Sequence, residues 1–495
     1  MPLTIYNTLT RRKAPFEPLS TGQVSMYCCG VTVYDYCHLG HARSYIVWDT
    51  VRRYLEWRGY SVRYVQNFTD IDDKILRRAV QEGSSMTAVS EKYIQAYFED
   101  MARLNVREAN DYPRATHTMD GIQRLIHELE QKGTAYAADG DVYYAVQKFP
   151  EYGKLSGRRL EDLQAGASGR VGDSPEAAKK AYPFDFALWK AAKPDEPAWD
   201  SPWGAGRPGW HIECSAMVRD RLGDSIDIHV GGGDLVFPHH ENEIAQSEAV
   251  TGKPLARYWM HNGMVNVGGE KMSKSLGNFT TIRQLLDEAG VSPMVLRLFV
   301  LQAQYRKPID FTDEAIASAR NGWETLRDGM AFGDRHGAAL GWSDVDDPSF
   351  GDPAAMRMPE SEATVQFQQA MDDDFNTSGA LVPLFELAKA LKRASNLIVH
   401  AGQADSDAQY LRQQWQTLIC LAQVLGLQIQ PDEAGAPEPT LTAAAVEAKI
   451  QQRRAAKQAK DYARADEIRE QLSAQGVVLV DKPGGVTEWH RAGSS

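Results

Sequence analysis

Apolar, strand-forming stretches alternate with amphipathic stretches through the first part of the chain. Residues 24–33 (VSMYCCGVTV) are rich in apolar and β-branched types and predict a buried strand. The sequence that starts at Gly40 (GHARSYIVWDTVRRYLEWRG) predicts a helix that ends at Gly59. A second strand, polar turn and helix follow at 61–83. Repeated strand–loop–helix units predict an α/β fold with a doubly wound parallel sheet.

The pattern changes in the middle of the chain and then returns. From about Pro113 to Trp203 the periodicity is mixed and turns are frequent, which predicts an insertion between two halves of the sheet domain. The strand SIDIHVGGGDLVF then enters a glycine-rich turn, and Pro238 is placed to start the helix HHENEIAQSEAVTG. The segment YWMHNGMVNVGGEKMSKSLGN predicts a short strand and a turn. These stretches restore the α/β pattern.

The remainder of the chain predicts helices separated by linkers. From Thr281 the sequence is helical, and two stretches rich in Gly, Pro, Asp and Ala, 333–356 and 430–440, predict linkers around a helical domain. The last block, 446–476, contains strong helix formers and an excess of Lys and Arg, and VVLVD after it predicts a strand. The basic segment 449–472 suits contact with RNA phosphates, although a solvated charged helix has the same composition.

Composition limits the class of protein. A chain of 495 residues with 43% hydrophobic content is long enough for several domains. The N-terminal residues lack the apolar segment of a secretory signal and no run of 18 apolar residues occurs, so we expect a cytoplasmic protein without a membrane segment. Five cysteines, an odd number, favour free thiols or metal ligands over disulfides. The net charge of −12 does not exclude a nucleic-acid partner, because the local field matters.

Two short motifs suit phosphate binding. His38-Leu39-Gly40-His41 falls where a strand gives way to a helix, whose first N–H groups and positive dipole end attract phosphate. Histidines at a helix start are also common as capping residues. Lys271-Met272-Ser273-Lys274-Ser275 lies in a loop, where two lysines suit a clamp on a triphosphate, although a solvated basic loop has the same composition.

A third pattern suits a metal. His239 and Glu243 are i and i+4 on the predicted helix and share one face. Such a pair is half of a metal site, or a solvated helix face. Cys214, in GWHIECSAM, is either a third ligand or a small core residue. Spacing leaves these alternatives open.

Taken together, HLGH and KMSKS resemble the paired signature of class I aminoacyl-tRNA synthetases. Within that class the chain resembles the cysteinyl-tRNA synthetases. The motifs that carry this resemblance span nearly the whole chain: YCCGVTVYDYCHLGH, NFTDIDDKI, GWHIECSAM, FPHHENEIAQ, EKMSKSLGN and MDDDFNT. The resemblance implies a cysteine–tRNA ligase, which activates L-cysteine with ATP and Mg²⁺ and joins it to cysteine tRNA.

The resemblance also implies roles for individual residues. It implies one zinc per chain, which binds the substrate thiolate; since a hydroxyl is a poor zinc ligand, the metal can reject serine without an editing domain. It places Thr69 and Trp210 at the cysteine pocket, although Trp210 also suits a core position. Val230 replaces the family's usual first glycine in DIHVGGGD. Cys28 and Cys37 are then structural. The implied zinc ligands are Cys29, Cys214, His239 and Glu243; the catalytic residues are His38, His41, Lys271 and Lys274, Lys274 foremost; the ATP contacts are Gly40, Gly231, Gly232, Asp234 and Lys274.

The predicted architecture follows from the pattern and the resemblance together. It has a Rossmann-like doubly wound catalytic domain with an insertion, an α-helical anticodon-binding bundle and a small C-terminal domain, in a chain expected to be monomeric. The predicted boundaries are 1–112 and 205–280 for the catalytic halves, 113–204 for the insertion, 281–330 for a helical stem-contact region, 331–360 for a linker, 361–428 for the bundle and 441–490 for the C-terminal domain.

Two other functions share parts of this pattern. A ligase that couples cysteine to an amino sugar has the same core and zinc, but it lacks a full anticodon-binding tail, whereas this chain continues to Ser495. A tRNA-binding or zinc-binding relic of the fold would be expected to lose HLGH or KMSKS. Both motifs are intact here.

Overall fold

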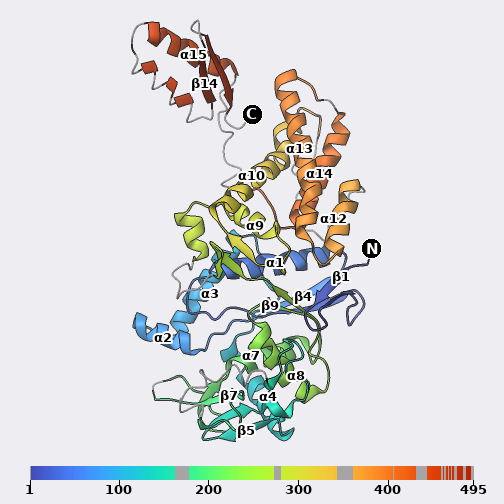
Figure 1. Ribbon diagram of the computed structural model, residues 1–495, viewed down its shortest axis with the longest axis vertical. Coiled ribbons are helices and arrows are strands. Elements are labelled where there is room, and N and C mark those ends of the chain that lie inside the picture. The colour runs from blue at the N-terminus through green and yellow to red at the C-terminus, as the bar shows by residue number, and fades with distance from the viewer. Residues whose placement is uncertain are drawn as a thin grey trace. The chain divides into compact units, whose positions relative to one another are not determined.

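The computed structural model describes residues 2–161, 178–194, 196–271, 280–342, 361–404 and 406–430, together with parts of 443–491. The chain divides into two compact units, Met1–Gln428 and Ile429–Ser495. Within the described residues, no helix has the length and apolar character needed to cross a membrane. The ribbon of Figure 1 is coloured along the chain.

A four-stranded parallel sheet forms the centre of the first unit. Its order is β10-β9-β3-β4, with β3 at Gln23–Cys28, β4 at Ser61–Gln66, β9 at Ile226–Gly232 and β10 at Ala256–Asn262. The chain passes from β3 to β4 through helix α1 and from β9 to β10 through α8, and Figure 1 shows these helices on opposite sides of the sheet. This arrangement confirms the predicted doubly wound sheet. Since the winding direction reverses between β3 and β9, a crevice is expected at their carboxyl ends.

Helix α1, Leu39–Trp57, is fixed by signals at both ends. The His38 side chain accepts hydrogen bonds from the first backbone N–H groups of the helix, so His38 is its N-cap. After the helix, Gly59 has φ +88°, a left-handed conformation in which a glycine costs little. Most of the helix is buried. Helix α1 is thus a central element that begins at the crevice.

Shorter elements complete this part of the unit. Helix α2 starts at the N-cap Asp72 and stops at Gly83, and α3 starts at the N-cap Ser85. The N-terminal strands β1 and β2 form an antiparallel hairpin, and the Thr8 N–H donates to the Trp259 carbonyl of β10. The bounds are β1 Thr4–Asn7, β2 Arg12–Pro15, α2 Asp73–Glu82, α3 Met86–Arg103, α7 Trp210–Leu222 and α8 Glu241–Thr251.

The predicted insertion contains a second sheet. Helix α4, Met119–Gln131, precedes an antiparallel sheet of order β5-β6-β7-β8. Its last strand, β8, spans Gly206–Pro208, slightly beyond the boundary predicted at 204. Figure 1 shows α4, β5 and β7 gathered with α7 and α8 at one end of the unit. The other strands are β5 Ala135–Ala138, β6 Asp141–Tyr144 and β7 Phe186–Ala191.

Helices form the other end of the first unit. A small sheet of order β12-β11-β13 leads into them, and α10, α13 and α14 pack together as a bundle. Within the predicted linker 331–360, Phe332–His336 form helix α11, and the Trp342 ring stacks on Trp415 with centroids 5.6 Å apart. This part of the segment is therefore packed against the bundle. The bounds are β11 Val265–Val267, β12 Glu270–Lys271, α9 Pro293–Leu301, β13 Ile309–Phe311, α10 Asp313–Met330, α12 Glu362–Asp372, α13 Thr377–Ala401 and α14 Ala408–Val424.

The second unit has a core of its own. Helix α15 spans Ala443–Gln458, and strands β14, Val477–Lys482, and β15, Val486–Arg491, form an antiparallel pair. The strand β14 lies where VVLVD predicted one. The buried core residues are Val446, Ile450, Ile468, Leu472, Val477 and Leu479.

Candidate functional site

Four side chains with metal-binding donors meet at the carboxyl ends of β3 and β9. Cys29 directly follows β3, and its N–H donates to the Val230 carbonyl of β9 at 3.3 Å. Cys214 lies on α7, Glu243 on the first turn of α8, and His239 in the helical turn Val236–His240 before it. Their donor atoms all lie within 4.8 Å of one another. Pro238, expected to start the helix, lies in this preceding turn instead, because α8 begins at Glu241.

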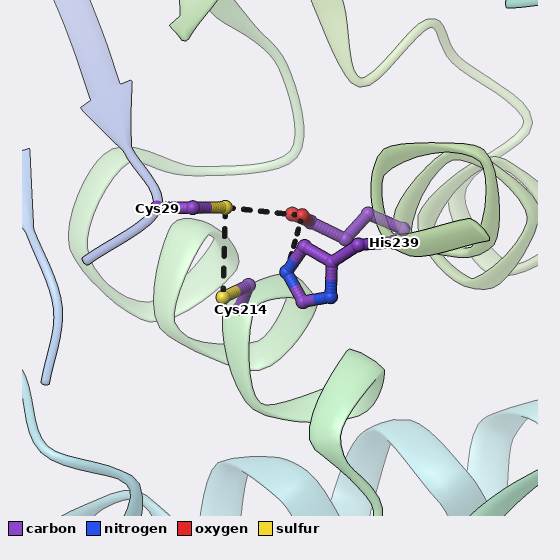
Figure 2. Close-up of side chains that lie close together, drawn as sticks. Cys29, Cys214 and His239 are labelled. Carbon is purple, nitrogen blue, oxygen red and sulfur yellow. Dashed lines mark hydrogen bonds and ion pairs between the residues drawn. The ribbon is translucent and has the colours of Figure 1, made fainter. Parts of the chain in front are cut away.

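The spacing of the donors fits a tetrahedral ion. The sulfur atoms of Cys29 and Cys214 are 3.8 Å apart, and Figure 2 shows them converging with His239 from separate elements. Glu243 Oε1 lies 3.3 Å from the Cys29 sulfur and 3.1 Å from His239 Nε2. Zinc–thiolate bonds of about 2.3 Å require sulfurs about 3.8 Å apart in a tetrahedron. The two-sulfur, one-nitrogen, one-oxygen set is therefore suited to zinc in both chemistry and spacing.

The electrostatics of the cluster also favour a cation. The Cys29 thiol donates to Cys214 and lowers the pKa of Cys214 to about 6, against the effect of burial. Burial raises the pKa of Glu243, but His229 and His239 outweigh it and hold that pKa well below its usual range. Burial lowers the pKa of His239, yet Cys214 and Glu243 raise it to about 10. These pKa shifts favour a proton held among Cys214, His239 and Glu243, and a metal ion can take the place of that proton.

Further histidines contact three of these four residues. His229 Nε2 lies 2.9 Å from Glu243 Oε2, and His211 Nδ1 lies 2.9 Å from His239 Nδ1. His240 contacts the Cys29 sulfur through Nε2 at 3.3 Å and His261 through Nδ1 at 2.7 Å. Partners of this kind fix the orientation and basicity of metal ligands.

A second set of donors overlaps the first. Cys29, His229, His240 and Glu243 also lie within 4.8 Å of one another. His229 and His240 are fully buried, whereas Trp210, which is 40% exposed, packs on His239 with ring centroids 4.2 Å apart. The set with Cys214 and His239 therefore adjoins a partly exposed side chain, that of Trp210.

The predicted pocket residues border the cluster. Thr69 is buried, and its hydroxyl donates to Glu213 at 3.1 Å. Glu213 adjoins Cys214 in sequence, and burial raises the pKa of Glu213 well above its usual range. Asn67 Oδ1 accepts from the Gly30 N–H at 2.8 Å and lies 3.8 Å from the Cys214 sulfur. Cys28 and Cys37 are buried free thiols outside both metal-binding sets.

The HLGH motif is at the same edge of the sheet. His38 Nδ1 accepts from the N–H groups of Gly40 at 3.0 Å and His41 at 3.3 Å, and His41 Nδ1 accepts from the His38 N–H at 3.3 Å. The two rings stack with centroids 3.7 Å apart. Since Nδ1 is the acceptor in each neutral ring, Nε2 carries the proton. Capping therefore uses Nδ1 of each ring and leaves the proton on Nε2, so the two roles considered for these histidines are compatible.

The glycine-rich strand has a regular backbone at Val230. Val230 is fully buried and pairs with Cys28 of β3 and Met260 of β10. A Cβ on Gly231 would come within 2.7 Å of the His240 ring, and one on Gly232 within 2.5 Å of Asp234 Oδ1. The valine side chain is thus accommodated within the paired part of strand β9. The two glycines that follow lie where His240 and Asp234 approach the backbone too closely for a Cβ atom.

The KMSKS lysines are only partly covered by the structure. Lys274 lies outside the described residues, as does the side chain of Lys271. The description of the chain resumes at residue 280. The Leu39 N–H donates to the Thr280 carbonyl at 3.1 Å, and the Ile282 N–H donates to the Cys37 carbonyl at 2.9 Å. The chain therefore re-enters the described structure directly beside HLGH.

Several residues of the site carried no clear signal in the sequence. Asn67, His229, His240 and Glu213 all lie in motifs noted for their resemblance, but no spacing rule separates them from core residues. His261 lies in a strand with no motif of its own. Only packing brings these side chains to the cluster.

Comparisons with known proteins agree with this geometry. Residues 15–321 match the model of the tRNA synthetases class I (C) catalytic domain, residues 366–430 match the DALR domain, and residues 439–489 match the cysteinyl-tRNA ligase anticodon binding domain. Mycobacterium tuberculosis methionyl-tRNA synthetase has a similar fold, with a TM-score of 0.53 and 15% identity over 81% of this chain and 89% of the other. An Agrobacterium radiobacter LeuRS in a ternary complex with tRNA gives a TM-score of 0.56 at 13% identity, over 83% and 85% of the two chains. The fold and catalytic domain are those of a class I aminoacyl-tRNA synthetase.

Full-length relatives narrow the class to one family. A cysteine–tRNA ligase of Synechococcus elongatus is 69% identical over 493 residues, which cover 99% of this chain and 100% of the relative. One of Rippkaea orientalis is 63% identical over 99% of this chain and 100% of its own length. The chain belongs to the cysteine–tRNA ligase family.

Proposed function

We propose that this chain activates L-cysteine with ATP to cysteinyl-adenylate and transfers cysteine to the 3′ end of cysteine tRNA, releasing pyrophosphate and AMP. The observation that carries this proposal is the Cys29–Cys214–His239–Glu243 cluster, which lies at the carboxyl end of β3, the end from which the chain leads through HLGH into α1. The four-residue cluster suits the binding of a thiol, and HLGH suits the binding of a triphosphate. The full-length likeness to cysteine–tRNA ligases supports the same assignment.

The cluster would hold one zinc, and the zinc would bind the thiolate of the substrate. Zinc distinguishes thiolate from hydroxyl, which an apolar pocket separates only about a hundredfold. Trp210 and Thr69 border the cluster and would enclose the rest of the amino acid. Selection of cysteine over serine then requires no second site.

The nucleotide would lie between HLGH and the glycine-rich strand end. The Nε2–H groups of His38 and His41, with Lys271 and Lys274, would stabilise charge on the phosphates, Mg²⁺ would accompany the ATP, and Gly40 would allow close approach. Gly231 and Gly232 would admit adenosine, and Asp234 would accept from ribose hydroxyls. We infer a monomer that works in the cytoplasm, with the helical bundle and the C-terminal domain binding the tRNA.

Cysteine-dependent ATP–pyrophosphate exchange is the direct test. We expect exchange with cysteine and none above background with serine, about one zinc per chain, and charging of cysteine tRNA in total tRNA. Exchange without tRNA charging would favour a ligase with another acceptor, such as an amino sugar. A folded, zinc-loaded protein that catalyses no exchange would contradict the proposal.

Lys274→Ala is expected to slow cysteine-dependent exchange by about 10²–10³-fold, because it removes one cation from the developing charge on the phosphates. Zinc content should be unchanged, since no metal-cluster residue is altered. Exchange rate and metal content of the same preparation check both statements. An exchange rate equal to that of the parent protein would remove Lys274 from the catalytic set.

A further inference from the structure

The acidic motif MDDDFNT, residues 371–377, lies at the junction between the helical bundle and the catalytic domain. It connects α12 with α13, and its three aspartates occupy different environments. Asp372 and Asp374 are buried, whereas the Asp373 side chain is 52% exposed and pairs with Lys13 on the surface. Three identical residues in a row therefore differ in burial and in their contacts.

Both carboxylate oxygens and both backbone polar groups of Asp374 form hydrogen bonds. Its Oδ1 accepts from the Tyr6 N–H at 2.8 Å and the Tyr305 hydroxyl at 2.9 Å. Its Oδ2 accepts from Arg306 Nε at 2.8 Å and Nη2 at 2.7 Å. The Asp374 N–H donates to the Thr4 carbonyl at 2.9 Å, and its carbonyl accepts from Gln304 at 3.1 Å. One residue thus joins strand β1 and the segment 304–306 to the start of α13.

The conformation of this turn depends on those contacts. Asp374 and Phe375 have φ +59° and +51°, a left-handed region that costs a non-glycine residue free energy unless its surroundings hold it there. The hydrogen bonds and the ion pair of Asp374 stabilise the turn in this conformation. A turn built in this way fixes the direction in which α13 leaves the catalytic domain.

The catalytic side of the junction has its own supports. Arg43, two residues after His41 on α1, donates from Nη1 to the Met264 carbonyl at 2.7 Å and from Nη2 to the Tyr305 carbonyl at 3.1 Å. The Gly263 N–H also donates to the Tyr305 carbonyl, at 2.8 Å, and β11 pairs with β13. None of these contacts involves Asp374. Loss of its carboxylate would therefore loosen the turn at the start of α13 while these contacts on the catalytic side stay in place.

We propose that Asp374 is a positioning residue that sets the helical bundle in register with the catalytic domain, so that the tRNA acceptor end reaches the adenylate. This inference rests on the proposed function. Adenylate formation uses only the catalytic domain, whereas transfer requires tRNA bound by the C-terminal parts of the chain. The two half-reactions consequently depend on Asp374 to different extents.

The test compares the two half-reactions in Asp374→Asn and in the matched control Asp373→Asn. We expect Asp374→Asn to lower kcat for tRNA charging about tenfold to a hundredfold, since a misplacement of about 1 Å can cost that much. The KM for tRNA and the rate of cysteine-dependent exchange should stay within about twofold. Asp373→Asn removes the same charge from the neighbouring exposed position and should leave both reactions unchanged.

A second variant makes a smaller change. Tyr305→Phe deletes only the hydroxyl that donates to Asp374 Oδ1, and it should lower charging in the same direction by a smaller factor. Equal losses of exchange and charging in Asp374→Asn, or parent-like charging in both variants, would overturn the positioning role. A parent protein inactive in both reactions would instead reject the proposed function.

Discussion

Cys214→Ala is expected to abolish the proposed zinc binding and, with it, cysteine-dependent exchange. Cys214 supplies one of the two sulfurs in the cluster, and its sulfur lies 3.8 Å from that of Cys29. Loss of a residue that merely orients a metal ligand costs about 10–100-fold in affinity or activity, so loss of a ligand should exceed a hundredfold in both. Metal content after dialysis and the exchange rate measure the two effects.

Cys28→Ala is the matched control for this substitution. Cys28 is as buried as Cys214, with 1% exposure for each, so both changes remove the same sulfur from the interior. Cys28 belongs to neither of the two donor sets. The control should therefore keep its zinc and its activity. Equal metal content in the two variants would show that Cys214 is not a ligand.

His38→Asn is expected to reduce cysteine-dependent exchange by about 10²–10³-fold without a comparable loss of stability, because it removes the proposed donor to the phosphates but keeps a helix cap. The ring of His38 accepts from the N–H groups of Gly40 and His41. An asparagine oxygen can accept from the same groups, but asparagine has no equivalent of the outer Nε2–H. Exchange rates and Tm values separate these two roles of the residue.

His38→Ala completes that comparison. Alanine lacks both the cap and the donor, so its exchange rate should match that of His38→Asn while its stability falls by about 1 kcal/mol. Activity in His38→Asn within twofold of the parent would mean that His38 serves only as the N-cap. Both variants leave Cys29, Cys214, His239 and Glu243 unchanged, and their metal content should equal that of the parent.

The local pattern of the sequence was enough to predict the doubly wound sheet and the start of α1. Hydrophobic periodicity and the residues that start or end a helix can be recognised within a few positions of the sequence. The His38 cap and the glycine at position 59 are helix-end signals of this kind. The i, i+4 spacing of His239 and Glu243 also brought two donors together correctly, although His239 lies in the turn before the helix. That both bind zinc remains a prediction.

The meeting of distant residues was decided only by the tertiary structure. Cys29 and Cys214 are 185 positions apart, and their contact depends on the strand order β9-β3 and on how α7 packs, which no periodicity encodes. The same holds for His229 beside Glu243 and for the different environments of Asp373 and Asp374. By itself the sequence determined which elements form and which chemical groups they carry. The packing of those elements decided which groups share a site, because burial and long-range contacts are properties of the folded chain.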